Sequence, residues 1–450
     1  MKESPETTLA ALRTALESED IDRARQLVND LHPADLAVAI GDLPLQEQTE
    51  MLPTLSLDDA ADVLEHLDED EAAEIAAQLP LQMLASVLDE MEPDEAADIL
   101  LDLDETHAAA ALRKMTSSET VHPLLEHADD TAGGRMTTRV PVLRRRMSAS
   151  QAITYLRSLK PDSEQHYYLY VVDRNRRLIG VVGLRELVTA PPSASIESIM
   201  STEVISASVS ADQEECAQLM SRYELMTLPI VGDGNHLAGV ITYDDLVEVI
   251  EDEATEDIYA LASLSADSDL DVFSPVRMMV SRRLPWLYLN LGTAFLAAFV
   301  ISRFEAIIAK IAVLAIFQSV VAGLGGNAGT QALALMVRGL ALGQVEFRHL
   351  WKALGRELVV GLLHGLAIGS AVAGVVYLWR GNPLLGLIIG LATFGNLLVA
   401  GLMGTLVPLT LKALRLDPAL ASSVLVTGTT DAVGFALFLG LATLYLPYLT

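Results

Sequence analysis

Five long apolar stretches occupy the second half of the chain. They lie near residues 284–303, 308–337, 353–379, 384–411 and 421–446. A helix of about 20 apolar residues crosses the ~30 Å hydrocarbon core of a bilayer. The pattern therefore predicts an all-α transmembrane domain of five helices within residues 277–450.

The first 130 residues carry a different pattern, in which Ala and Leu recur at helical spacing among Asp and Glu. Prolines divide this pattern into short helices, at Pro33, Pro44, Pro53, Pro80 and Pro93. Residues 58–64 (DDAADVL) recur 36 positions later as residues 94–100 (DEAADIL), and a related fragment lies at 70–75 (DEAAEI). Such an internal repeat predicts an acidic, superhelical α-helical repeat domain over residues 1–130.

Residues 131–250 alternate between strand and helix patterns, again in two copies. The stretch 168–187 is matched by 227–246, and each reads as strand, turn, strand and helix. This α/β duplication resembles a tandem pair of cystathionine-β-synthase-type (CBS) domains. The resemblance implies that adenine nucleotides, with ATP as the candidate, bind between the copies through a Thr/Ser-x-x-Asp motif. The second copy has this motif, as Thr242 and Asp245; a purely structural cleft is the alternative.

Charge divides the chain at about residue 271. Residues 1–271 hold 55 of the 60 acidic residues and 18 of the 30 basic ones, a net charge of −37, whereas residues 272–450 carry a net charge of +7. A surface this negative attracts cations and argues against nucleic acid as a partner. The first part is therefore expected to be a soluble region that meets cations.

The basic residues also predict a topology. With the N-terminus inside, nine basic residues flank the apolar stretches on the cytoplasmic side and three on the other. The first residues show no signal-peptide pattern, and the lone cysteine, Cys216, suits a reducing compartment. We expect a multi-pass protein of the cell (inner or plasma) membrane, with cytoplasmic N-terminal domains and an outer C-terminus.

An acidic segment leads from the CBS pair towards the first apolar stretch. Within residues 244–257, Asp245, Glu248, Asp252 and Glu256 share one face of a predicted helix. Like charges at this spacing repel, and a divalent cation would relieve the repulsion. The segment 251–276 is therefore predicted as an acidic connecting helix or linker; a solvated linker without cation binding is the alternative.

One carboxylate, Asp431, lies near the middle of the last apolar stretch. An ionised side chain there costs at least ~2.5–3.5 kcal/mol on insertion scales, so it should face a bundle interior or water. Small residues surround it, among them Thr427 and Gly428. Packing partners alone would satisfy such an Asp, but intramembrane acids mark ion paths by default, and we favour a cation pathway.

The second apolar stretch contains the run GLGGNAGTQ, from position 323 to 331. Its glycines should weaken a helix or allow close approach of another backbone, and Asn327, Thr330 and Gln331 offer neutral oxygens. Two interpretations of this run are open: its glycines form a packing seam against another helix, or the run forms part of a pore wall. Carboxylate, amide and carbonyl oxygens suit a hard cation such as Mg²⁺.

The order of acidic repeat, CBS pair, acidic helix and five spans with GGNAGTQ and TTDAVG resembles the MgtE family of magnesium channels and transporters. The resemblance implies a homodimer in a lipid bilayer with a central pore. Its pore residues would be Asp431, Asn327, Gly325, Gly326, Thr427 and Gly428. Its cytosolic Mg²⁺ sensor would comprise Asp94, Asp98, Asp212, Glu214, Glu224, Asp245, Glu248, Glu253, Glu256 and Asp257. Ser319 replaces a proline usual in the family.

The expected function is Mg²⁺-selective uptake, gated by cytosolic Mg²⁺ through negative feedback. The chain lacks the phosphate-binding loop of an ATPase and any evident nucleophile–base set, so we expect no enzyme. Two alternatives remain at this point: a transporter of broader divalent range (Co²⁺, Mn²⁺), and a non-conducting, membrane-anchored sensor of Mg²⁺ or nucleotide.

Overall fold

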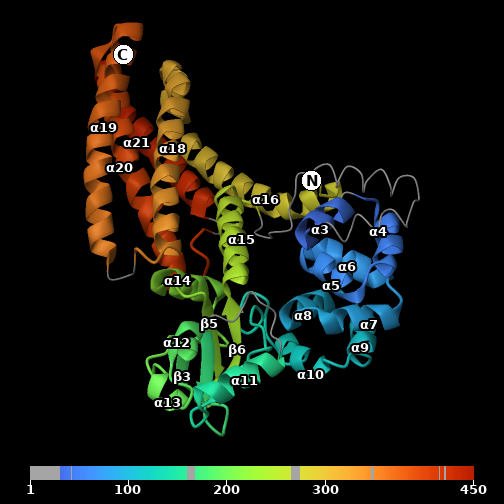
Figure 1. Cartoon of the computed structure of the whole chain (residues 1–450). Helices are drawn as coiled ribbons and strands as arrows, with labels where there is room; N and C mark the ends of the chain where they lie inside the picture. Colours follow the sequence, from blue (N-terminus) through green and yellow to red (C-terminus); the bar gives the residue numbers. More distant parts are fainter. Residues whose placement is uncertain are drawn as a thin grey trace, which may run out of the picture. The chain divides into compact units, whose positions relative to one another are not determined.

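The computed structural model describes residues 31–41, 43–159, 168–264, 274–345, 349–414, 416–419 and 422–449. The chain divides into two compact units, Met1–Ile250 and Glu251–Thr450 (Figure 1). The first contains the helical repeat and two small sheets, and the second contains the long apolar helices.

The repeat is built from short helices that begin every twelve residues. They are α3 (Pro33–Gly41), α4 (Leu45–Met51), α5 (Leu57–Glu65), α6 (Glu69–Gln78), α7 (Leu81–Glu90), α8 (Pro93–Asp102) and α9 (Glu105–Leu112). Alternate helices pack together, so that α3, α5, α7 and α9 form one layer and α4, α6 and α8 the other. The predicted helical repeat is confirmed, but the 36-residue spacing seen in the sequence corresponds to three twelve-residue units.

The alanines of the repeated motif explain the packing of this domain. Ala60 and Ala61 in α5, and Ala96 and Ala97 in α8, are buried in one continuous core. Small side chains at these positions let the short helices approach closely. That core continues into the second CBS copy through residues such as Cys216.

The CBS pair contains two sheets of the same topology. The first joins β1 (Val142–Arg144), β2 (Tyr168–Val172) and β3 (Leu178–Gly183), and the second joins β4 (Ala207–Ser208), β5 (Thr227–Gly232) and β6 (His236–Thr242). In each sheet the first pairing is parallel and the second antiparallel. Helices α11 (Ala149–Leu159), α12 (Leu184–Thr189), α13 (Ile196–Ile199) and α14 (Gln213–Tyr223) complete the pair, which confirms the predicted α/β duplication.

The acidic helix is α15 (Tyr243–Leu261), which starts directly after β6. It therefore begins inside the second CBS copy and contains the predicted acidic face, and the predicted connecting segment 251–276 starts within it. Residues 265–273 of the predicted connecting segment lie outside the described part of the chain.

In the described part of the second unit, five helices are long and apolar enough to cross a membrane, as the sequence predicted. They are α16 (Val276–Ser302), α18 (Val313–Ala341), α19 (Leu350–Arg380), α20 (Pro383–Ala413) and α21 (Ser422–Leu444). The first starts earlier than expected, with Pro285 inside it. The second starts later than position 308, because the short helix α17 (Glu305–Lys310) precedes it. A last short helix, α22 (Leu446–Leu449), follows α21.

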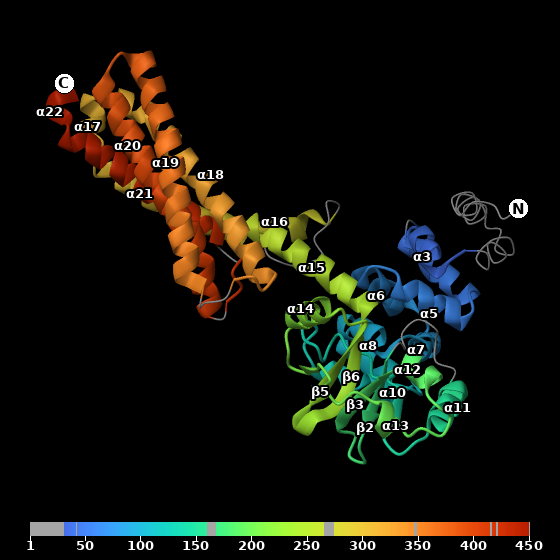
Figure 2. The ribbon, with the colours of Figure 1, turned by 60° about the vertical axis from the view of Figure 1, so that its left-hand side comes forward.

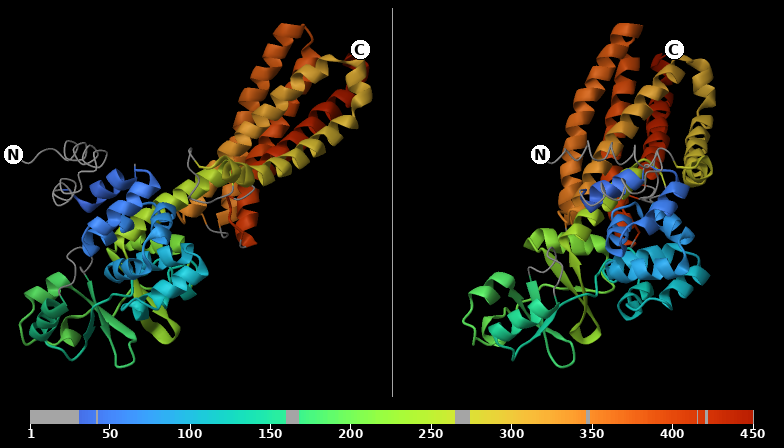
Figure 3. Two further views of the ribbon diagram at one scale, coloured as in Figure 1. Left: turned by 90° about the vertical axis from the view of Figure 1, so that its right-hand side faces the viewer. Right: turned by 45° about the vertical axis from the view of Figure 1, so that its right-hand side comes forward.

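Helix α20 is central to this bundle and packs against α18, α19 and α21 (Figures 2 and 3). Close backbone contact explains the α19–α20 pairing, since a Cβ on Gly369 would lie 2.7 Å from the carbonyl oxygen of Gly390. Helix α16 packs on α21, and few of its residues are buried. The face formed by α18 and α21 carries the intramembrane polar residues described next.

Candidate ion pathway and acidic cluster

The glycine run of the second span lies inside one unbroken helix, α18. Gly325 and Gly329 occupy its buried side, where a Cβ on Gly329 would lie 2.5 Å from Cγ1 of Val426 in α21. A Cβ on Gly325 would overlap the amide of Asn396 in α20. The expected weakening of the helix is not observed; on this side the glycines serve close packing.

The opposite side of α18 is polar and exposed in the single chain. Gly323, Asn327 and Thr330 follow one another at helical spacing on this side, and each is exposed. The Thr330 hydroxyl donates to the carbonyl oxygen of Gly326 at 3.0 Å, which leaves its lone pairs towards the open side. The run thus combines both readings of the sequence, with a packing seam on one side and a polar surface on the other.

Asp431 lies half-buried on α21. Across the described residues it has no hydrogen-bond or ion-pair partner. Helices α18 and α21 meet one turn away, where a Cβ on Gly326 would lie 3.7 Å from Cγ2 of Thr427. Gly428 faces α16 instead, with Cβ of Thr293 2.8 Å from the place of a Cβ.

Sequence reasoning missed Asn396, a polar residue at the centre of the bundle. It is fully buried in α20, and its Nδ2 donates to the carbonyl oxygen of Val321 in α18 at 2.9 Å. Its Oδ1 has no hydrogen-bond partner within the described part of the chain. The amide lies between Gly325 of α18 and Gly434 of α21, so it joins three helices behind the polar side of α18. An amide in the middle of an apolar span was the available signal.

In the first unit, carboxylates of the repeat and of α15 come together in an acidic cluster. Asp94 is 8% exposed, and its Oδ1 has no hydrogen-bond partner. Burial and the nearby Asp245 and Glu92 raise the pKa of Asp94 well above its usual range. Burial likewise raises the pKa of Asp98 to about 8 and that of Asp245 to about 6. These carboxyls are held near one another at a cost that a bound cation would remove.

The remaining predicted sensor residues are distributed over α14 and α15. Asp212 caps α14, where its Oδ1 accepts from the backbone NH of Glu214 at 2.8 Å, and Glu224 ends that helix with a φ of 53°. Glu248, Glu253, Glu256 and Asp257 lie along α15. In the described residues no group of three or more His, Cys, Asp or Glu side chains is already arranged to hold a metal ion.

The last turns of α15 belong to the membrane unit. Ala260 is buried with Val337 of α18 and Val426 of α21, and the Ser263 hydroxyl lies 2.7 Å from that of Ser423. Burial and the nearby Asp417 raise the pKa of Asp257 to about 6, while Arg338 opposes this. The end of α15 therefore packs at the end of the α18–α21 pair.

The proposed nucleotide residues form a local motif. Both the backbone NH and the hydroxyl of Thr242 donate to Oδ2 of Asp245, at 2.9 and 2.7 Å. A small cleft beside Thr242 is lined by Arg139, Tyr170 and Thr227 among others. Asp245 thus belongs both to this motif and to the acidic cluster.

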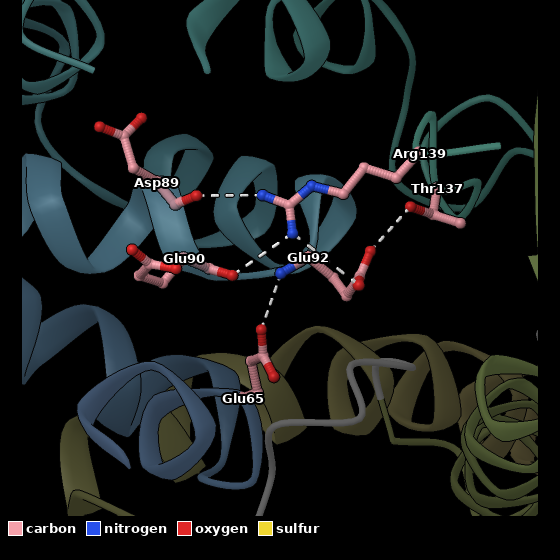
Figure 4. Close-up of polar contacts among 6 residues, drawn as sticks. All are labelled: Glu65, Asp89, Glu90, Glu92, Thr137 and Arg139. Atoms are coloured by element: carbon pink, nitrogen blue, oxygen red, sulfur yellow. Dashed lines mark hydrogen bonds and ion pairs between the residues drawn. The ribbon is translucent and has the colours of Figure 1, made fainter. Parts of the chain in front are cut away.

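Two arginines missed by sequence reasoning tie the repeat to the CBS pair. Arg139 donates to the carbonyl oxygens of Asp89 (3.0 Å) and Glu90 (3.3 Å) and lies 3.9 Å from the Glu92 carboxylate (Figure 4). Thr137 donates to the same carboxylate at 3.1 Å, and the NH of Glu92 donates to Glu65. The second arginine, Arg135, forms an ion pair with Glu69 at 3.3 Å.

Models of known families match successive parts of the chain. The intracellular N domain of MgtE matches residues 31–130, the CBS domain matches 132–193 and 196–252, and MgtE, described as a divalent cation transporter, matches 318–441. Inosine-5′-monophosphate dehydrogenases match only a small part, as in Nitrosopumilus maritimus, with 32% identity over 17% of this chain and 16% of the relative.

Solved structures and relatives that match over most of the chain agree with these family matches. The soluble part of a magnesium transporter has 31% identity and a TM-score of 0.52, covering 56% of this chain and 100% of that one. The cytosolic domain of the Mg²⁺ channel MgtE in complex with ATP has 33% identity and a TM-score of 0.51, covering 54% and 99%. The magnesium transporter MgtE of Thermus thermophilus is 36% identical over 72% of each chain, and that of Bacillus subtilis is 31% identical over 94% of each. The chain therefore belongs to the MgtE family of divalent cation transporters.

Proposed function

We propose that this transporter conducts Mg²⁺ through a pore between two copies of the chain, lined by α18 and α21. The observation that carries this is Asp431, a carboxylate in a membrane span with no partner among the described residues of its own chain. Lipid would penalise it strongly, so it belongs against water or another protein surface. The exposed Asn327 and Thr330 on the neighbouring helix need the same environment.

The chemistry of these groups suits a hydrated magnesium ion. Mg²⁺ releases its water reluctantly, and a pair of carboxylates, one from each copy, can hold it through those waters. Asp431, Asn327, Gly326 and Thr427 would face the ion, while Gly325 and Gly428 set the helix spacing behind them. An inside-negative potential contributes ~2.3 kcal/mol per charge per 100 mV, so influx needs no enzymatic energy source.

We further propose that internal Mg²⁺ closes the pore through the acidic cluster. The buried Oδ1 of Asp94, which has no hydrogen-bond partner among the described residues, and the raised pKa of Asp245 mark a place where positive charge is missing. The sensor residues would be Asp94, Asp98, Asp212, Glu214, Glu224, Asp245, Glu248, Glu253, Glu256 and Asp257. A cation held there would fix α15, whose last turns pack on α18 and α21.

The proposed orientation puts the N-terminal domains in the cytoplasm and the C-terminus outside, as the basic flanks predict. The cleft beside Thr242, together with the Thr242–Asp245 motif, is proposed as the ATP site. The relative solved with ATP supports this assignment. The motif in the first copy differs, so one cleft per chain is proposed to bind nucleotide.

The test is Mg²⁺ flux into liposomes containing the purified protein. Asp431→Asn and Asp431→Ala should reduce flux to the level of protein-free vesicles, and Glu305→Gln, in the short helix α17, should conduct like wild type. Wild-type flux from a folded, inserted Asp431→Ala protein would overturn the pore assignment. Competition by Co²⁺ or Mn²⁺ would widen the substrate range, and absence of flux in the wild type would favour a non-conducting sensor.

A further inference from the structure

Arg135 lies in the acidic cluster as a largely buried positive charge. Its side chain is 12% exposed, and its Nη1 lies 3.3 Å from Oε1 of Glu69 in α6. Its Nε donates to Oε1 of Gln213, the first residue of α14, at 3.2 Å. One guanidinium thus joins the acidic repeat to the second CBS copy.

The carboxylates around Arg135 form one side of the cluster. Burial works to lower the pKa of Arg135, but Asp129, Glu69 and Asp98 together outweigh burial and raise it. Arg135 in turn is the group that lowers the pKa of Asp98 against the effects of burial, Asp129 and Glu69. The carboxylates of Glu69, Asp98 and Asp129 are therefore already partly neutralised by the guanidinium of Arg135.

The other side of the cluster has no such charge among its named neighbours. The groups that act on Asp94 are Asp245, Glu92 and Asp98, all of them acidic, and its Oδ1 has no hydrogen-bond partner. Glu95 is likewise surrounded by Asp94, Asp98 and Glu248. The two sides therefore differ in what they need from solution: one is partly neutralised, and the other needs a cation or protons.

We propose that Arg135 is a resident cation that holds the repeat against the CBS pair without metal and confines regulatory Mg²⁺ to the Asp94–Asp245 side of the cluster. This rests on the proposed Mg²⁺ sensing and defines how that sensing is set. A guanidinium attached to the chain cannot diffuse away. The contact between the repeat and the CBS pair through Arg135 therefore persists at low Mg²⁺. The remaining cation sites then fill at a lower Mg²⁺ concentration than they would if every carboxylate pair had to be bridged by metal.

The test follows Mg²⁺-dependent protection of the full-length protein from chymotrypsin, a protease whose sites the substitutions leave unchanged. Arg135→Gln should shift the protection midpoint to at least about threefold higher Mg²⁺ and steepen the curve, because Glu69, Asp98 and Asp129 then become an additional cation site. Arg135→Lys, which keeps the charge, should fall between it and wild type. Arg145→Gln removes an exposed arginine, 3.8 Å from Glu197, and should not move the midpoint.

Each result decides the proposal. An unchanged or lower midpoint in Arg135→Gln, or an equal shift in Arg145→Gln, would overturn it. If Arg135→Gln fails to reach wild-type protection at any Mg²⁺ concentration, the Arg135→Gln/Glu69→Gln pair replaces it. That pair should keep the raised midpoint but lose the added steepness, and a wild-type midpoint would count against the proposal. Failure of Mg²⁺ sensing itself looks different, since the wild type would then show no Mg²⁺-dependent protection.

Discussion

At the scale of single residues, the membrane unit depends on one buried amide. Asn396 joins α20 to the carbonyl oxygen of Val321 and fills the space left by Gly325 and Gly434. Neither glycine has a Cβ, and a Cβ at either position would collide with the Asn396 amide. The three residues therefore form a unit, and a change in one should alter the effect of a change in another.

We predict that Gly325→Ala destabilises the detergent-solubilised protein by about 1–3 kcal/mol, because the new Cβ meets the Asn396 amide. Asn396→Ala should also destabilise it, but the double variant should lose less than the sum of the two. Thermal unfolding midpoints check this. Gly355→Ala is the control, because nothing lies within 4 Å of its Cβ position. Additive losses would contradict the proposed unit.

From the sequence alone, a candidate residue can be singled out where its type is unusual in its segment. A carboxylate in an apolar span singles out Asp431 without knowledge of its neighbours. Arg135 gave no comparable signal, because its importance depends on what lies opposite it. The amide of Asn396 in an apolar span was a signal, but its partners on α18 and α21 depend on the packing. Periodicity gives the face of a helix, and it leaves the partner of that face undetermined.

At the scale of elements, α15 is the part whose position matters most. It continues the second CBS copy from Tyr243 and ends at Leu261 beside α18 and α21. Its acids include Glu248 near the cluster and Asp257 near Asp417. Cations bound between these acids and the carboxylates near them would hold the helix by directed bonds, which neutral amides replace only weakly.

We predict that Glu248→Gln with Glu256→Gln and Asp257→Asn leaves the pore open at internal Mg²⁺ levels that close the wild type. Mg²⁺ flux into liposomes with preset internal Mg²⁺ measures this. A variant with three exposed acids of the repeat removed, Glu47, Glu74 and Glu119, controls for total charge. Unchanged Mg²⁺ dependence in the α15 variant would make this helix a solvated linker.

The sequence predicted the type of nearly every element, because five apolar spans and two strand–turn–strand copies are strong patterns. Their ends were less accurate. The first span was predicted from about residue 284, yet α16 begins at Val276 and includes Pro285. The acidic helical face predicted within residues 244–257 lies in α15, and the predicted connecting segment 251–276 begins inside this helix.

At the scale of the whole molecule, the repeat is a separable regulator in our proposal. It contributes Asp94 and Asp98 to the cluster and contains none of the five apolar helices. Its core, however, is shared with the second CBS copy, including Cys216 and Leu228. Removal of the repeat therefore exposes apolar surface as well as deleting carboxylates.

We predict that a chain lacking residues 1–130 still conducts Mg²⁺ but is shut off only weakly by internal Mg²⁺. The full-length Asp94→Asn variant should share the weaker shut-off, because it removes the same carboxylate without exposing the core. Flux at increasing internal Mg²⁺ compares the two with wild type. A truncated protein that inserts properly and carries no flux would show that the repeat is needed for conduction.

The twelve-residue spacing of the repeat has a consequence for how its two surfaces arose. Copies of the acidic motif 36 residues apart are an odd number of helices apart, so they lie in opposite layers of the stack. Asp58 is accordingly exposed to solvent, while its counterpart Asp94 is buried. Because the copies are an odd number of helices apart, one copy of the motif faces solvent and the other is buried. The buried copy can then take a second role without any change in its own sequence. Insertion of one further helix would exchange the layers, whereas insertion of two would preserve them.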